Sequence, residues 1–65
     1  MTLADLLQIY HPYTYSSDIV YRDVIGQTSI ADPYNYPNRL RAKVLAISVN
    51  MDTLHVLLDW NFNLD

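Results

Sequence analysis

The sequence predicts a small domain of the α+β or mostly β class, with one short N-terminal helix and a curved antiparallel sheet of three to five strands. Apolar residues recur at helical spacing near the start of the chain, and they alternate at strand spacing from 39 to 60. Proline, asparagine and glycine separate these patterned segments. With 65 residues the chain allows one domain, 1–65. A small barrel of the SH3-like type is one form that such a sheet takes.

An N-terminal helix is expected from Thr2 to Tyr10. The Thr2 hydroxyl is placed to cap the first turn, and Asp5 follows at the position where an acid favours the positive helix end. The apolar residues that then recur at helical intervals are Leu3, Leu6, Leu7 and Tyr10. Pro12 excludes the α conformation at His11 by steric clash, so the helix should end near Tyr10.

Short strands and turns are expected in the middle of the chain. Residues 13–17 combine β-prone residues with turn formers and predict an extended lead-in. Residues 18–25 contain four β-branched residues and favour a strand, while Ser17 leaves a capped helix as the alternative. Gly26, the only glycine, is expected to end this element, and 27–30 is a further strand candidate.

A β-hairpin is predicted from Arg39 to Trp60, after a loop at 32–38 in which two prolines and two asparagines should exclude regular structure. Only an even-numbered connection places the apolar residues of both strands on one face, so the turn is predicted at Met51–Asp52. The resulting pairs are Val49 with Leu54, Ile47 with Val56, Leu45 with Leu58, and Lys43 with Trp60. Residues 61–65 form a tail or extend the sheet.

Composition excludes several classes of protein. About half of the residues are apolar (51%) and 17% are charged, so the chain should form a core rather than stay disordered. The absence of cysteine excludes disulfides and thiolate metal sites. A net charge of −3 repels nucleic acids and anionic membranes. With neither a spanning segment nor the basic start of a signal peptide, the expected location is soluble, in the cytoplasm or within a viral particle.

The apolar share is high for so small a domain. A chain of this length hides only about 60% of the surface that its unfolded form exposes, and small folds usually compensate with disulfides, a metal or a partner subunit. A larger protein partner or a homo-oligomer is therefore expected.

Catalytic and metal-binding patterns give no site. His55 and Asp59 lie on the same side of a predicted strand but about 13 Å apart at roughly 3.3 Å per residue. His11 lacks the spacing of a joint metal ligand, and the serines and aspartate of 16–18 fit a turn or cap better than a nucleophile. The lone Gly26 excludes a glycine-rich phosphate loop. We expect no enzyme activity, no metal and no cofactor.

Tyrosine is the most distinctive residue type, with all six copies in the first 36 positions. In Tyr13-Thr14-Tyr15 and Tyr34-Asn35-Tyr36, the two rings share one side if the backbone is extended. Tyrosine combines an apolar ring with a polar tip, which suits interfaces. The alternative is that these rings cover a small core. The partner-binding candidates are Tyr13, Tyr15, Tyr34 and Tyr36.

A basic stripe is predicted at Arg39, Arg41 and Lys43 from their strand spacing. It either contacts a phosphate or an acidic partner, or, as the favoured interpretation, it is a solvated strand end whose charges guard a sheet edge against aggregation. The sequence from Arg39 to Asn61 resembles the middle hairpin of Tudor-type and other SH3-like small barrels, where an Arg-Ala-x-Val strand precedes a strand ending in Asp and an aromatic residue. Asn61 replaces the glycine that usually follows, and no methyl-lysine site carries over. The resemblance implies a barrel that reads a peptide or a nucleic acid.

The favoured function is a non-enzymatic protein-binding or assembly component, such as a small inhibitor, an accessory protein or a minor structural subunit. It is expected to dock through the tyrosine-rich loops, a sheet edge, and the side chains of Arg39 and Arg41. Small, cysteine-free, acidic and tyrosine-rich chains occur among phage-encoded inhibitors and minor particle proteins, which favours a viral or phage origin by association. The alternative function is the peptide- or nucleic-acid-reading barrel.

Overall fold

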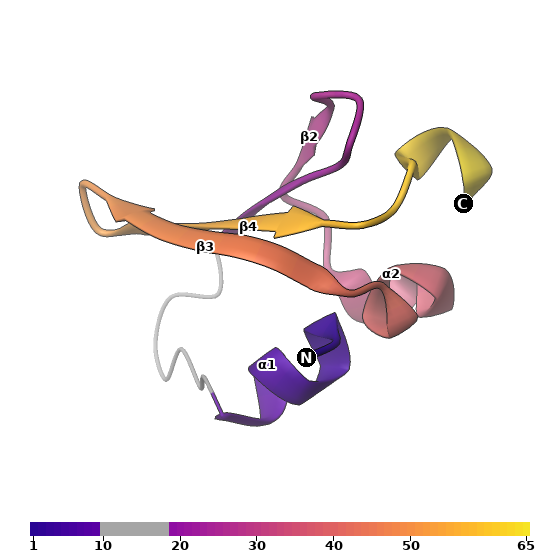
Figure 1. The fold of residues 1–65 in the computed structure, drawn as a ribbon, viewed down its shortest axis with the longest axis horizontal. Helices are drawn as coiled ribbons and strands as arrows, with labels where there is room; N and C mark the ends of the chain where they lie inside the picture. Colours follow the sequence, from indigo (N-terminus) through magenta and orange to yellow (C-terminus); the bar gives the residue numbers. More distant parts are fainter. Residues whose placement is uncertain (10–18) are drawn as a thin grey trace.

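The computed structural model describes residues 1–9 and 19–65 and has the predicted α+β architecture (Figure 1). Helix α1 lies against one side of a four-stranded sheet. The elements are α1 (Leu3–Ile9), β1 (Ile19–Arg22), β2 (Thr28–Ser29), the 3-10 helix η2 (Pro33–Asn35), α2 (Pro37–Arg41), β3 (Val44–Asn50), β4 (Thr53–Leu58) and the 3-10 helix η3 (Phe62–Leu64).

The sheet is mixed, and the prediction of an antiparallel sheet is only partly correct. Its strand order is β2-β1-β4-β3. The pairs β1–β2 and β3–β4 are antiparallel, but β1 runs parallel to β4. Parallel neighbours need a long connection, and the chain between β1 and β4 supplies it. Because β2 and β3 are the two outer strands, the sheet is open, and the expectation of a closed small barrel is wrong.

Helix α1 confirms the predicted N-terminal helix and its cap. The Asp5 N–H donates to Thr2 Oγ1 at 3.2 Å, and the Thr2 N–H donates to Asp5 Oδ2 at 3.0 Å. This reciprocal pair satisfies backbone donors that the first turn leaves free. The bond from the Thr2 backbone also holds the pKa of Asp5 below its ordinary value. A helix of seven residues is too short to persist alone, and burial of Leu3 and Leu6 docks it on the sheet.

The β3–β4 hairpin confirms the predicted turn and register near the turn. Asn50 pairs with Thr53 across Met51–Asp52, and the predicted pairs Val49–Leu54 and Ile47–Val56 are both present. The predicted pair of Leu45 with Leu58 is wrong. A β-bulge between Val44 and Ala46 shifts the register, so that Val44 pairs with Leu58 and Ala46 with Leu57.

The hairpin is shorter than the predicted 39–60 because its first residues belong to helix α2. Pro37 occupies the first turn of α2, where its missing N–H costs nothing and its fixed φ suits the helix. Lys43 does not face Trp60; it forms a bridge with Thr2, ahead of α1. The basic residues expected at strand spacing therefore do not form a stripe along one strand.

The segment 32–38 is also more regular than predicted. The Asp32 carboxylate accepts a hydrogen bond from the Tyr34 N–H at 3.0 Å and caps η2. Pro33 and Pro37 each lie at a helix start, where proline is tolerated. The same residues that signal a loop thus begin two short helices.

The core lies between α1 and the adjacent face of the sheet. Its buried members are Leu3, Leu6, Ile19, Tyr21, Ala42, Leu54, Val56 and Leu58. The parallel register pairs Ile19 with Leu54 and Tyr21 with Val56, which places β1 and β4 side chains on one apolar face. Burial raises the pKa of Tyr21 to about 12, with smaller contributions from the charges of Asp32 and Tyr34. This tyrosine is a core residue.

Candidate protein-binding surface

Strand β3 and the turn that follows it carry apolar side chains that remain exposed. Four residues, here called the β3 surface, make up this patch: Leu45, Ile47, Val49 and Met51. Val49 is 72% exposed and Met51 91% exposed. The register places Ile47 and Val49 on the same sheet face as the buried side chains of Val56 and Leu54. The apolar face of the sheet therefore continues beyond the core, and apolar patches of this kind mark interaction sites.

Part of the outer backbone edge of β3 pairs with none of the residues that the structure describes. Asn50 and Thr53 flank the two-residue turn, and the residues at these positions are hydrogen-bonded to each other. Along an antiparallel pair of strands, successive residues point their backbone N–H and C=O groups alternately toward the neighbouring strand and away from it. Consequently Ser48 and Asn50 direct their N–H and C=O groups toward β4, whereas Ile47 and Val49 direct theirs outward. From Ala46 to Asn50 this edge pairs with none of the described residues; we call it the open edge.

The other end of the β3 edge is covered. The Val44 N–H donates to the Met1 carbonyl at 2.8 Å, and the Leu3 N–H donates to the Ala42 carbonyl at 2.9 Å. The segment ahead of α1 thus lies beside the start of β3. The open edge begins past this segment and past the β-bulge, and it ends at the hairpin turn, which lies at the end of the molecule away from α2 (Figure 1).

The hairpin turn is itself unusual in its residues. Met51 has a φ of 51° and Asp52 a φ of 68°, so both are left-handed, as a type I′ turn requires. Asparagine, aspartate and glycine are the usual residues at these positions, and a residue such as Met51 is strained there by roughly 1–2 kcal/mol. The turn therefore holds an almost fully exposed methionine in a costly backbone conformation. Strain of this kind is found at functional surfaces.

The opposite face of the hairpin has a shallow hollow. Residues that line it include Arg22, Ala46, Ser48, Asn50, His55 and Leu57. Its polar groups come from three adjacent strands, β1, β3 and β4. Asp59, the residue considered with His55 as an acid–base partner, is not among the lining residues. In residues 1–9 and 19–65, no three His, Cys, Asp or Glu side chains are grouped so as to hold a metal ion.

The predicted tyrosine sites lie in three different settings. Tyr13 and Tyr15 fall outside the described residues, as does His11. Tyr34 lies on η2 and is 65% exposed. Tyr36 is half-buried. The structure therefore does not bring Tyr34 and Tyr36 onto one exposed aromatic surface, because the backbone between them is helical rather than extended.

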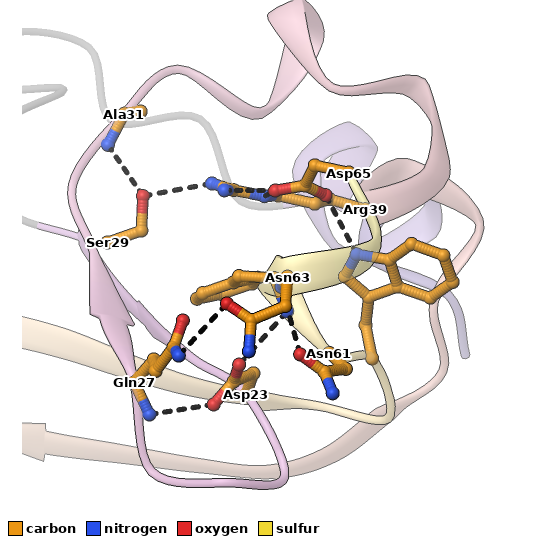
Figure 2. Close-up of polar contacts among 10 residues, drawn as sticks. Asp23, Gln27, Ser29, Ala31, Arg39, Asn61, Asn63 and Asp65 are labelled. Atoms are coloured by element: carbon orange, nitrogen blue, oxygen red, sulfur yellow. Dashed lines mark hydrogen bonds and ion pairs between the residues drawn. The ribbon is translucent and has the colours of Figure 1, made fainter.

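Arg39, predicted as a partner-binding residue, is buried within the domain. Its guanidinium carbon lies 4.0 Å from the ring centre of Tyr36 and 4.0 Å from that of Phe62, so the cation is stacked between two rings. Nε donates to Asp65 Oδ2 at 2.9 Å, Nη2 forms an ion pair with the same oxygen, and Nη1 donates to Ser29 Oγ at 2.9 Å. Its binding groups are occupied inside the chain (Figure 2).

The Asp65 carboxylate joins this cluster from the C-terminal segment. Its second oxygen accepts a hydrogen bond from Trp60 Nε1 at 2.8 Å. Partial burial opposes the charged form of Asp65, but the hydrogen bonds from Arg39 and Trp60 and the charge of Arg39 outweigh it and hold the pKa of Asp65 below its ordinary value. Arg41, the other predicted basic site, is exposed at the last residue of α2.

A second polar cluster centres on Asp23, which is 1% exposed. Its Oδ1 accepts from the N–H groups of Gln27 at 2.7 Å and Ile25 at 3.2 Å, and its Oδ2 accepts from the Phe62 N–H at 3.0 Å. The Gln27 side chain also bonds Asn63 Oδ1 at 3.2 Å (Figure 2). The Asp23 cluster ties the C-terminal segment to the loop that follows β1, and the Arg39 cluster ties it to α2 and β2, which gives both clusters a structural role.

The sequence-based interpretation missed the exposure of the β3 surface. Alternation places Ile47 and Val49 on an apolar face, and an apolar face is expected to be buried. A local signal was present, since residues 44–51 form the uncharged run Val-Leu-Ala-Ile-Ser-Val-Asn-Met. Edge strands are normally protected by charges or proline, and this run has neither.

Comparison with known proteins gave no match: no family model, no curated protein and no solved structure matches the chain. The candidate surface is therefore defined by its geometry alone. Among the helices in the described ranges, none has both the length and the apolar character required to cross a membrane.

Proposed function

We propose that this chain is a non-enzymatic protein-binding component that binds an extended segment of another polypeptide along the open edge of β3. The observation that carries this proposal is that one strand combines exposed apolar side chains with backbone groups that pair with none of the described residues. An added strand gains backbone hydrogen bonds from the edge and side-chain contacts from the face.

The side chains of the β3 surface are suited to an apolar segment of a protein rather than to a phosphate-bearing ligand. Its exposed side chains are aliphatic or thioether groups, which gain free energy by leaving water and make no specific contact with phosphate. Complete burial of one large apolar side chain contributes about 1.5–3 kcal/mol. Burial of Val49 and Met51, the two most exposed members, therefore supplies a useful part of a binding free energy, against the cost of ordering the partner.

Tyr34 and Arg41 are proposed as secondary contacts because both side chains are exposed. Arg39 and Tyr36 are proposed instead to hold the fold, since the guanidinium is buried against the Tyr36 ring. Substitution of Tyr34 by alanine should then weaken partner binding modestly without changing the stability of the domain.

Site-specific photo-crosslinking tests the proposed function. A photoreactive amino acid replaces Val49 in one variant and Asn38, an exposed residue of α2, in a matched control. In cells that produce the chain, the Val49 variant should give discrete covalent adducts with protein, and the Asn38 variant should give few. Equal adduct yields at the two positions would contradict the proposal.

A further inference from the structure

We infer that the strand bound at the open edge is β3 of a second copy of this chain, in an antiparallel arrangement centred on Ser48. This inference rests on the proposed function and names its partner. The four-stranded sheets of the two copies then join into one continuous sheet, and a two-fold axis perpendicular to this sheet relates the two copies.

The register follows from the part of β3 that is free. The β-bulge between Val44 and Ala46 distorts one end of the strand, and Met1 occupies the edge beside Val44. The regular open edge is thus 46–50, and Ser48 is its middle residue. Centring the two-fold axis on Ser48 pairs this whole segment with its copy and leaves the bulges outside the contact.

The backbone groups are complementary in this register. Ile47 of one copy lies opposite Val49 of the other, and these two residues direct their N–H and C=O groups outward. Opposite residues of this type exchange both hydrogen bonds in an antiparallel ladder. Each copy therefore supplies donors and acceptors that the other needs, without disturbing the pairing of β3 with β4.

The side chains are complementary as well. On the core face, Ile47 and Val49 of one copy meet Val49 and Ile47 of the other, so apolar groups pair with apolar groups. On the opposite face, Ser48 lies against Ser48 and Ala46 against Asn50, and all of these are small or neutral. No charged residue falls within 44–50, so the pairing places no like charges opposite each other.

Charges of opposite sign flank the contact. Lys43 and Asp52 lie on either side of the uncharged run 44–51, and both are exposed. In the antiparallel arrangement, the hairpin turn of one copy, which holds Asp52, lies toward the end of the other copy's β3 that follows Lys43. Opposite charges near each other attract, and the two-fold axis repeats this approach twice. A parallel arrangement would bring the like charges of the two copies toward each other, which selects against it.

Native mass spectrometry and disulfide trapping of the full chain test this inference. The mass should change from 7.6 kDa toward twice that value as the protein concentration rises. Ser48→Lys should raise the dissociation constant of the dimer by roughly tenfold or more, because it sets two like charges face to face at the axis. Thr28→Lys, with the same charge change on the other edge strand β2, should have little effect.

Because the chain has no cysteine, single cysteines report the register. Ser48→Cys should form an intermolecular disulfide rapidly on oxidation, whereas Ala46→Cys alone should do so slowly. A mixture of Ala46→Cys and Asn50→Cys chains should give the mixed disulfide. Circular dichroism of each variant verifies that the monomer fold is kept.

The outcomes separate the two proposals. A chain that stays at 7.6 kDa at all concentrations, while Val49 crosslinks to a different protein, overturns the dimer and supports the proposed function. A dimer that forms equally well with Ser48→Lys overturns the assignment to β3. A chain that neither dimerises nor crosslinks from Val49 overturns both.

Discussion

The buried guanidinium of Arg39 on α2 forms an ion pair with the Asp65 carboxylate, so the C-terminal segment is fastened to a helix 26 residues earlier in the chain. The guanidinium is stacked between the rings of Tyr36 and Phe62, and the arginine is 6% exposed. No residue of the β3 surface takes part in the contact between Arg39, Asp65 and the two rings. Structure and binding are therefore assigned to different residues and can be tested separately.

Removal of the Arg39 side chain should strongly destabilise the domain. Arg39→Ala leaves the Asp65 carboxylate and the two aromatic rings without their partner, and loss of one member of a buried pair costs about 3–5 kcal/mol. Chemical denaturation measures this change in the free energy of unfolding. Arg41→Ala, which removes an exposed arginine from the same helix, should stay within about 0.5 kcal/mol of the parent. Similar effects for the two variants would contradict the structural role of Arg39.

The stability of the domain should fall in acid. The pKa of Asp65 is lower in the folded chain than its ordinary value of about 3.9. The stabilisation is therefore present above pH of about 4 and is lost as the pH falls through the folded pKa, because the unfolded chain takes up the proton first. Asp5 acts in the same direction. Asp65→Asn should show a shallower loss of stability between pH 5 and 2, measured by thermal unfolding; an unchanged slope would rule out this linkage.

At alkaline pH, Tyr21 should behave differently from an exposed tyrosine. Its pKa is raised to about 12 by burial, above the ordinary value of about 10. Stability from the neutral phenol is thus complete below pH of about 10 and is lost as the pH rises toward 12. Ultraviolet titration of tyrosinate should show a late component, and Tyr21→Phe should remove it. If Tyr21→Phe leaves the titration curve unchanged, the ring is not buried as described.

The hairpin turn should tolerate stabilising changes. Met51→Asn with Asp52→Gly introduces the residues that a type I′ turn favours, and it should relieve left-handed strain by about 1–2 kcal/mol in total. The melting temperature should rise accordingly. Because Met51 also belongs to the β3 surface, the same variant should bind its partner more weakly. A lower melting temperature would show that the turn is not of this type.

Local chemistry allowed much of the fold to be predicted. Thr2 and Asp5 identified the start of α1. The requirement for an even-numbered connection predicted the Met51–Asp52 turn and the residue pairs nearest to it. The bulge near Val44 was not predictable from alternation, since it arises where β3 meets Met1 and the end of α2. The parallel pairing of β1 with β4 also depends on contacts distant in sequence.

The sequence predicted that a binding surface exists at a sheet edge but did not predict which strand forms it. A high apolar share in a short chain predicted an uncovered surface, and a sheet edge was among the expected contacts. Which edge it is depends on strand order, and this placed β3 on the outside. Arg39 looked like an exposed strand residue because Pro37 was interpreted as a loop residue, when in fact it begins the helix that buries Arg39.

Amide hydrogen exchange along β3, followed by NMR, shows directly whether the outer edge of this strand is free in the monomer and covered on binding. In dilute solution, the amides of Ile47 and Val49 should exchange quickly, and those of Ser48 and Asn50 should be protected by β4. When the edge is occupied, either by a second copy at high concentration or by a captured protein, Ile47 and Val49 should become protected as well. Protection of all four amides in dilute solution, or no change on binding, would show that partners do not bind along this edge.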